Sequence, residues 1–157
     1  MVEIIETTTD SAYQAAVQLF KEYQTAIGID LEFQNFKKEI QDIKAQYSRP
    51  EGDIFVVYTN KDFPSGCFGV RKLTDSICEL KRMYLKPELQ GLGIGTTLVE
   101  RSFEFAKELG YEKMRLDTLD TMHAAIALYT KMGFYEIEPY RFNPLKGAKY
   151  FEVDLMD

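Results

Sequence analysis

The sequence predicts an α+β fold in which helices cover a mixed sheet. Short runs rich in β-branched and aromatic residues alternate with longer runs whose apolar residues recur at helical spacing. Near the middle of the chain, three strand-like runs follow one another between short turns, which is typical of an antiparallel meander. A strand–helix–strand unit comes later, so the two kinds of element are predicted to stack in layers around one core.

The first part of the chain is predicted to supply one strand and two helices. Residues 2–8 alternate β-branched side chains and indicate a strand. A helix follows, with Asp10 or Ser11 as its cap and Gly28 at its end, because its apolar positions have helical spacing. Residues 34–47 are predicted to form a second helix with its apolar side chains on one side.

The rest of the chain is predicted to hold the meander, two more helices and three more strands. The meander strands are residues 53–58, 66–72 and 76–85. The helix after them is predicted to run from Gly91 to Leu109, with an inner face formed by Leu98, Val99, Ser102, Phe103, Ala106 and Leu109. The remaining elements are a strand at 113–118, a helix at 122–132, and strands at 134–138 and 150–155.

Length and composition limit what the protein can be. Its 157 residues suit one domain, expected to span residues 1–157, whose core needs no disulfide or metal. The net charge of -6 argues against a nucleic-acid partner, which requires a basic face. No apolar run reaches the ~20 residues of a membrane span and no signal peptide is expected, so a cytoplasmic location is predicted. Cys67 and Cys78 are expected to be buried reduced thiols, and the lone histidine, His123, predicts no metal site.

A glycine-rich run lies where a strand ends and a helix begins. Pro87 turns the chain, and Gly91, Gly93 and Gly95 follow at alternate positions. The first N–H groups of a helix have no partner within the helix and lie at the positive end of its dipole. Glycines let the backbone approach a ligand closely, so this run predicts a cradle for an anion such as a diphosphate.

Three kinds of phosphate-binding loop have glycines in comparable arrangements. A P-loop requires a lysine after its last glycine, which this run lacks. A dinucleotide-binding loop has Gly-x-Gly-x-x-Gly early in a parallel sheet, whereas here Gly-x-Gly-x-Gly follows a meander. The third pattern, Gln/Arg-x-x-Gly-x-Gly/Ala, agrees with residues 90–95 at every fixed position.

The third pattern resembles the motif of the GNAT family of N-acetyltransferases. Residues 79–88 resemble the fourth strand of that family, and residues 124–134, which end in Leu-Tyr-x-x-x-Gly-Phe, resemble its fourth helix. The order of elements agrees along essentially the whole chain. The resemblance implies a GNAT fold with a mostly antiparallel sheet of about seven strands, four flanking helices and a splay between strands four and five.

The resemblance also implies that acetyl-CoA is the co-substrate. In the family, the pantetheine arm lies between the splayed strands and pairs with backbone groups of strand four, which here belong to Met83, Tyr84 and Leu85. The diphosphate accepts hydrogen bonds from the glycine run. The cofactor-binding residues implied there are Gln90, Gly91, Leu92, Gly93, Ile94, Gly95 and Thr96.

Acetyl transfer requires a neutral amine, a donor for the thioester oxygen and an acid for the leaving sulfur. The N–H of Met83 can serve the oxygen. Tyr129 agrees with the family tyrosine that protonates the sulfur, although its helix face also suits simple packing in the core. Glu79 lies where some members have a general base, and burial would favour that role by raising its pKa. The alternative is a strand carboxylate that is exposed or paired with a Lys or Arg.

The fourth-helix region departs from the family pattern, because it has no asparagine near its start. His123 lies there instead, where it can touch the cofactor or simply lie on the surface. Asp117, at the end of a strand, can face the acceptor. The surrounding residues resemble a bacterial subgroup of the family whose substrate is unassigned.

In the family, the acceptor pocket lies between the N-terminal helices and the loop before the last strand. The candidate acceptor-binding residues in these segments are Phe33, Phe36, Tyr140 and Arg141. The Arg141 guanidinium can bind a carboxylate through two hydrogen bonds, or it can be a solvated loop arginine. Acidic residues such as Glu39 can attract a polyamine or a lysine, or they can form only a solvated helix face.

The predicted function is transfer of an acetyl group from acetyl-CoA to a primary amine of a small molecule, an amino acid or a peptide. The amine attacks directly while both substrates are bound, and the family makes a homodimer a reasonable expectation. Two alternatives stay open. A non-catalytic acyl-CoA-binding sensor would release no thiol with any amine, and a nucleotide-binding oxidoreductase would bind NAD in preference to CoA.

Overall fold

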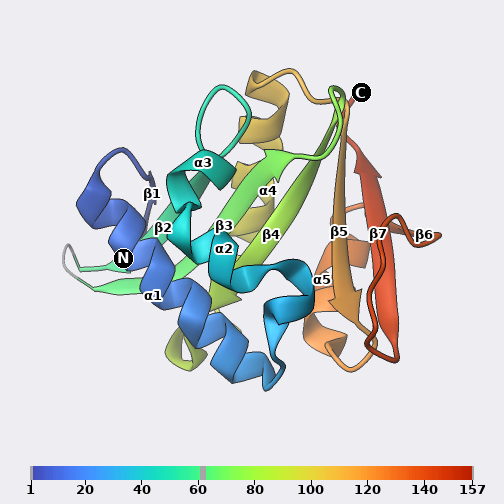
Figure 1. Ribbon diagram of the computed structural model, residues 1–157, viewed down its shortest axis with the longest axis horizontal. Coiled ribbons are helices and arrows are strands. Elements are labelled where there is room, and N and C mark those ends of the chain that lie inside the picture. Colours follow the sequence, from blue (N-terminus) through green and yellow to red (C-terminus); the bar gives the residue numbers. More distant parts are fainter. Residues whose placement is uncertain (1, 61–62, 157) are drawn as a thin grey trace.

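One seven-stranded sheet carries the site, with helices on both of its faces (Figure 1). The computed structural model describes residues 2–60 and 63–156, apart from the side chains of Phe33 and Gln34. The strands are β1 (Val2–Glu6), β2 (Asp53–Thr59), β3 (Pro64–Lys72), β4 (Ile77–Leu85), β5 (Lys113–Leu119), β6 (Tyr135–Ile137) and β7 (Ala148–Asp154). Their order is β1-β2-β3-β4-β5-β7-β6, and every neighbouring pair is antiparallel except β4 and β5. The predicted α+β class and the mostly antiparallel sheet are confirmed.

The helices form two layers. The first layer holds α1 (Asp10–Ile27), the 3-10 helix η1 (Leu31–Gln34), α2 (Phe36–Gln41) and α3 (Ile43–Gln46). The second holds α4 (Ile94–Glu108) and α5 (His123–Lys131), and a short 3-10 turn, η2 (Pro87–Leu89), precedes α4. Figure 1 shows the first layer in front of the sheet and α4 behind it. In the described part of the chain, no helix combines the length and apolar character that a membrane span needs.

Alternation along β2 builds two separate cores. Ile54 and Val56 pack with α1 in front of the sheet, while Phe55 and Val57 pack with α4 behind it. All four side chains are fully buried. Because successive strand side chains point to opposite faces, a strand that is apolar throughout is covered on both sides. The meander therefore forms the middle layer of the molecule.

The N-terminal helices differ from their prediction. The predicted helix at 34–47 is broken into η1, α2 and α3. Asn35 has a left-handed φ of 57° and Asp42 leaves helical geometry, so the hydrogen-bond ladder stops twice. The cap of α1 is Thr9, whose side chain accepts from the N–H of Ala12, and the predicted caps Asp10 and Ser11 are wrong by one or two positions.

The helix after the glycine run begins later than predicted. Gly91 and Gly93 both have left-handed φ angles, 78° and 80°, so α4 starts at Ile94 and the predicted start at Gly91 is wrong. The inner face also shifts, because Phe105 is buried where the prediction had Phe103 and Leu109, which are only partly buried. The three residues before α4 are thereby free to form a loop around a ligand.

The two parallel strands separate after a short contact. β4 pairs with β5 only over Ile77–Glu79, although β4 continues to Leu85. A β-bulge interrupts β4 as well, since Arg82 has a φ of 55° and the register with β3 shifts there. Figure 1 shows β4 and β5 diverging below their point of contact. The expected splay between strands four and five is therefore present, and it positions the site.

Candidate active site

The glycine run forms an open loop at the N-terminus of α4. A Cβ added at Gly91 or Gly93 would meet no atom within 4 Å, so the space beside both residues is open. No side chain among the described residues caps α4, and its first turn holds no acidic residue. The first N–H groups of the helix therefore face an open region at the positive end of the helix dipole. This arrangement fits a diphosphate.

Gly95 has a different role from the first two glycines. A Cβ at this position would lie 3.0 Å from Cδ2 of Leu128, so the absence of a side chain allows α4 and α5 to approach closely. Gln90 also acts within the protein, because its side-chain amide donates to the carbonyl of Leu85 over 3.0 Å. That bond ties the loop to the end of β4.

A mostly apolar groove of about 570 Å³ leads from the loop along the edge of β4 to the start of α5. Seven of the predicted cofactor-binding residues line it: Met83, Tyr84, Leu85, Gln90, Gly91, Gly95 and His123. The other four, Leu92, Gly93, Ile94 and Thr96, lie beside the groove in the loop and the first turn of α4. His123 is exposed at the first position of α5. An elongated ligand with an anionic end fits this shape.

Tyr129 lies in the core behind the sheet, and its neighbour Leu128, not Tyr129 itself, lines the groove. The side chain of Tyr129 is buried on α5 and packs edge-on against Phe134. Burial raises the pKa of Tyr129, and electrostatic interaction with Tyr23 of α1 raises it further. α1 and α5 lie on opposite faces of the sheet, so the two tyrosines influence each other where β4 and β5 have separated. Tyr129 therefore keeps its proton at neutral pH, and the raised pKa makes its hydroxyl a weaker acid than that of a free tyrosine.

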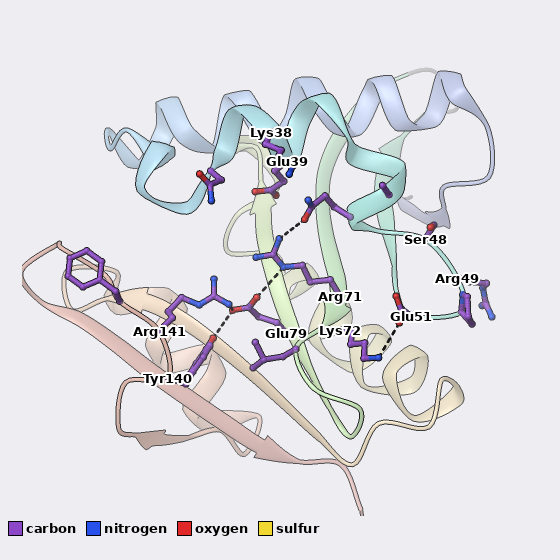
Figure 2. Close-up of a pocket in the computed structure, with 16 residues that line it drawn as sticks. Lys38, Glu39, Ser48, Arg49, Glu51, Arg71, Lys72, Glu79, Tyr140 and Arg141 are labelled. Carbon is purple, nitrogen blue, oxygen red and sulfur yellow. Dashed lines mark hydrogen bonds and ion pairs between the residues drawn. The ribbon is translucent and has the colours of Figure 1, made fainter.

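A second, larger cavity of about 860 Å³ opens in front of the sheet (Figure 2). It lies between α2–α3 and the loop that carries Tyr140 and Arg141. Five cationic side chains line it, which are Lys38, Arg49, Arg71, Lys72 and Arg141. Three carboxylates, Glu39, Glu51 and Glu79, line it as well. The cavity is therefore polar and carries an excess of positive charge.

Glu79 lies at the centre of this cavity and is fully buried. Oε1 accepts from Nε of Arg71 over 3.2 Å, and Oε2 accepts from Arg141 over 2.5 Å. Tyr140 donates its hydroxyl to Oε2 over 2.8 Å (Figure 2). These contacts bring together three of the predicted site residues, Glu79, Tyr140 and Arg141.

The pKa of the Glu79 carboxyl is lowered, not raised. Burial alone raises it, but nearby cations outweigh burial, in the order Lys81, Arg141 and Arg71. The condition that would favour Glu79 as a base, a raised pKa, is therefore not met, and the alternative of a carboxylate paired with arginines describes it. Burial also raises the pKa of Tyr140, and the negative charge of Glu79 adds to that shift.

Behind these residues lies a smaller cavity of about 50 Å³ at the opening of the splay. Lys81 and the predicted acceptor residue Asp117 line it together. Lys81 is fully buried, and burial lowers its pKa to about 8. The pattern of the sequence did not single out Lys81, because a lysine in an alternating strand ordinarily faces water.

The bulge in β4 places Arg82 on the same face as Lys81. Arg82 donates to both carboxylate oxygens of Glu39, at 2.7 and 3.2 Å, and both side chains are almost completely buried. The prediction of Glu39 as a solvated acid or an amine attractor is therefore wrong. Phe36, predicted to bind the acceptor, is buried in the front core under the Arg82 guanidinium. The side chain of Phe33, also predicted there, lies outside the described residues.

Comparisons with known proteins agree with this architecture. Residues 5–134 match the acetyltransferase (GNAT) family. The chain is 36% identical to an uncharacterized N-acetyltransferase of Schizosaccharomyces pombe over 138 residues, which cover 87% of this chain and 85% of that protein. It is 30% identical to an uncharacterized N-acetyltransferase of Dictyostelium discoideum, over 92% of this chain and 94% of that protein.

A solved structure also shares the fold. A GNAT-family acetyltransferase of Staphylococcus aureus superposes with a TM-score of 0.82 at 23% identity, over 99% of this chain and 100% of that one. The two sequence relatives above come from eukaryotes, so the expected bacterial subgroup stays a prediction. The family match, these relatives and the splayed sheet agree, and the chain belongs to the acetyltransferase (GNAT) family, as an N-acetyltransferase.

Proposed function

We propose that the protein transfers an acetyl group from acetyl-CoA to a primary amine. The observation that carries this proposal is the continuous groove from the open glycine loop to the splay of β4 and β5, with cavities for a second substrate on the other face. A ligand in the groove and an amine from the front can meet between the strands. Direct attack within such a ternary complex needs no covalent enzyme intermediate.

Each part of the groove suits a part of acetyl-CoA. The N–H groups around Gly91 and Gly93 would hold the diphosphate at the start of α4. The free edge of β4 at Met83 and Leu85 would pair with the amides of the pantetheine arm. The bound thioester supplies an activated acetyl carbon to the splay.

Residues beside the splay would assist the transfer. The N–H of Met83 would donate to the thioester oxygen as negative charge develops there. The amine nitrogen bonds to the acetyl carbon as the carbon–sulfur bond breaks, and the Tyr129 hydroxyl would give its proton to the sulfur. The proton that the nitrogen loses would pass to solvent, from which Tyr129 would regain one. Asp117 and Tyr140 would contact the acceptor in front of the sheet. A cytoplasmic location, one domain over residues 1–157 and a homodimer stay predictions.

Tyr129→Phe tests the proposed acid. The variant keeps the ring that packs against Phe134 but removes the hydroxyl, so we expect kcat to fall roughly a hundredfold while the Kd for acetyl-CoA stays unchanged. Thiol release measures kcat, and calorimetry measures Kd. Tyr135→Phe on the exposed β6 is the control and should match the parent protein. Full turnover of the Tyr129 variant would remove its role as an acid.

Glu79→Gln tests whether Glu79 acts as a titrating base or as an ion-paired carboxylate that holds Arg71 and Arg141 in place. Because the pKa of Glu79 lies below its ordinary value of 4.5, the carboxylate stays ionised above about pH 5 and adds no limb to the pH profile of kcat/KM there. We expect the variant to be slower than the parent but to keep the positions of its pH limbs. A limb above about pH 5 that disappears in the variant would show instead that Glu79 titrates during catalysis.

A further inference from the structure

The front cavity is lined by more cationic side chains than carboxylates. Arg71 and Arg141 both face the single carboxylate of Glu79. Two of the other cations already have counter-charges: Lys72 pairs with Glu51 and Asp75, and Arg49 pairs with Glu6 and Glu108. The whole chain, in contrast, has a net charge of -6. A cationic cavity in an acidic protein is a local feature that attracts anions.

The hydrogen-bonding groups of the cavity are also incompletely used. Nε of Arg141 is buried and has no hydrogen-bond partner among the described residues. A buried donor without an acceptor costs roughly 1–3 kcal/mol, which a ligand would recover only if its acceptor reached Nε. The two arginine side chains line the cavity and remain 18% and 22% exposed, although Arg71 also donates to Oε1 of Gln46.

We infer that this cavity binds a carboxylate of the acceptor, held between Arg71 and Arg141, and that the acceptor is therefore an amine with a terminal acid. The inference rests on the proposed function and names its substrate class. A planar guanidinium matches a carboxylate through two parallel hydrogen bonds. Glu79 and Tyr140 keep the two guanidinium groups in place, and Lys38 at the rim adds a further positive charge.

The geometry also limits the length of the acceptor. Glu79 is the last residue of β4 that pairs with β5, and Met83 lies four positions further along the strand. A regular strand rises about 3.3 Å per residue, so the two backbone positions lie at most roughly 13 Å apart, because the bulge at Arg82 shortens the path. An α-amino acid, whose amine and acid share one carbon, is much shorter than this separation. The acceptor therefore has several bonds between its amine and its acid, as in an ω-amino acid or a short peptide.

A matched series of amines tests this inference. Glycine, 4-aminobutanoate, 6-aminohexanoate and 8-aminooctanoate are each compared with the corresponding primary amide by thiol release from acetyl-CoA. We expect the longer acids to exceed their amides in kcat/KM by roughly tenfold to a hundredfold, and glycine to show no preference for the acid over the amide. Arg141→Gln should bring the ratio of acid to amide close to one, and Arg141→Lys should give an intermediate ratio. Arg101→Gln, which removes an exposed arginine of α4, is the control and should keep the parent ratio.

The outcomes separate this inference from the proposed function. Equal rates for acids and amides at every length, in a protein that releases thiol, would overturn the carboxylate site and leave acetyl transfer intact. If no amine supports thiol release, the proposed function fails. In that case, calorimetry with N-acetyl-6-aminohexanoate tests the carboxylate site without turnover. The inference requires that the parent protein binds this compound and that Arg141→Gln weakens the binding at least tenfold. Equal affinity in both proteins would refute it.

Discussion

Gly93→Asp is expected to weaken the binding of acetyl-CoA about a hundredfold. Gly93 lies at the N-terminus of α4 with a φ of 80°, and a side chain there points into open space. The aspartate would therefore bring a negative charge into the loop that would hold the diphosphate. At an effective dielectric of about 20, two like charges about 5 Å apart cost on the order of 3 kcal/mol, which corresponds to the hundredfold loss.

Gly93→Asn is the matched control for this prediction. Asparagine has nearly the same shape as aspartate, and both residues tolerate a left-handed backbone better than other side chains do. We expect the asparagine variant to bind at least tenfold more tightly than the aspartate variant, and thermal unfolding should show that both fold. Calorimetry provides the two Kd values. Equal affinity in the two variants would mean that no anion lies next to Gly93.

Glu39→Gln is expected to lower the free energy of unfolding by about 3–5 kcal/mol, the range for removing one partner of a buried ion pair. Arg82 would be left in the front core, 3% exposed, without its counter-charge. The ion pair with Arg82 helps to lower the pKa of Glu39 in the folded protein. The contribution of the pair to the free energy of unfolding is therefore complete above the unfolded-state pKa of this carboxyl. The contribution is lost as the pH falls through the lower folded-state pKa. Urea unfolding at neutral pH measures the effect.

Two further variants separate the charge from the packing. Arg82→Met in the Glu39→Gln background removes the stranded charge, so the double variant should recover part of the lost stability. Asp10→Asn removes a partner from the exposed Lys44–Asp10 pair and should change stability far less than Glu39→Gln does. If Glu39→Gln and Asp10→Asn had equal effects, the buried pair would not stabilise the fold.

Local patterns in the sequence predicted the cofactor side well. The loop depends on Gln90 and its following glycines, which are contiguous, so a short motif is sufficient to identify it. The contact between α4 and α5 at Gly95 likewise joins nearby elements, because only β5 separates the two helices in the sequence. Tyr129 was identified from its helix and lies in the core behind the sheet, although its catalytic role stays a prediction.

The acceptor side could be predicted only in part, because its contacts join distant segments. Tyr140 meets Glu79 across 61 positions of sequence, and Arg82 meets Glu39 across 43. No periodic pattern reports such pairs. The β-bulge at Arg82 adds a second obstacle, since an extra residue in a strand changes which side chains face the helices. Arg71 and Lys81 therefore resembled ordinary strand cations.

The central claim is that main-chain N–H groups in the loop before α4 hold the diphosphate of acetyl-CoA. The most direct test is calorimetry with acetyl-CoA and, separately, with S-acetylpantetheine, which has the same thioester arm but no diphosphate. We predict saturable binding of acetyl-CoA and an affinity for S-acetylpantetheine at least a hundredfold lower. Equal affinity for the two compounds, or no binding of acetyl-CoA to the folded protein, would contradict the claim.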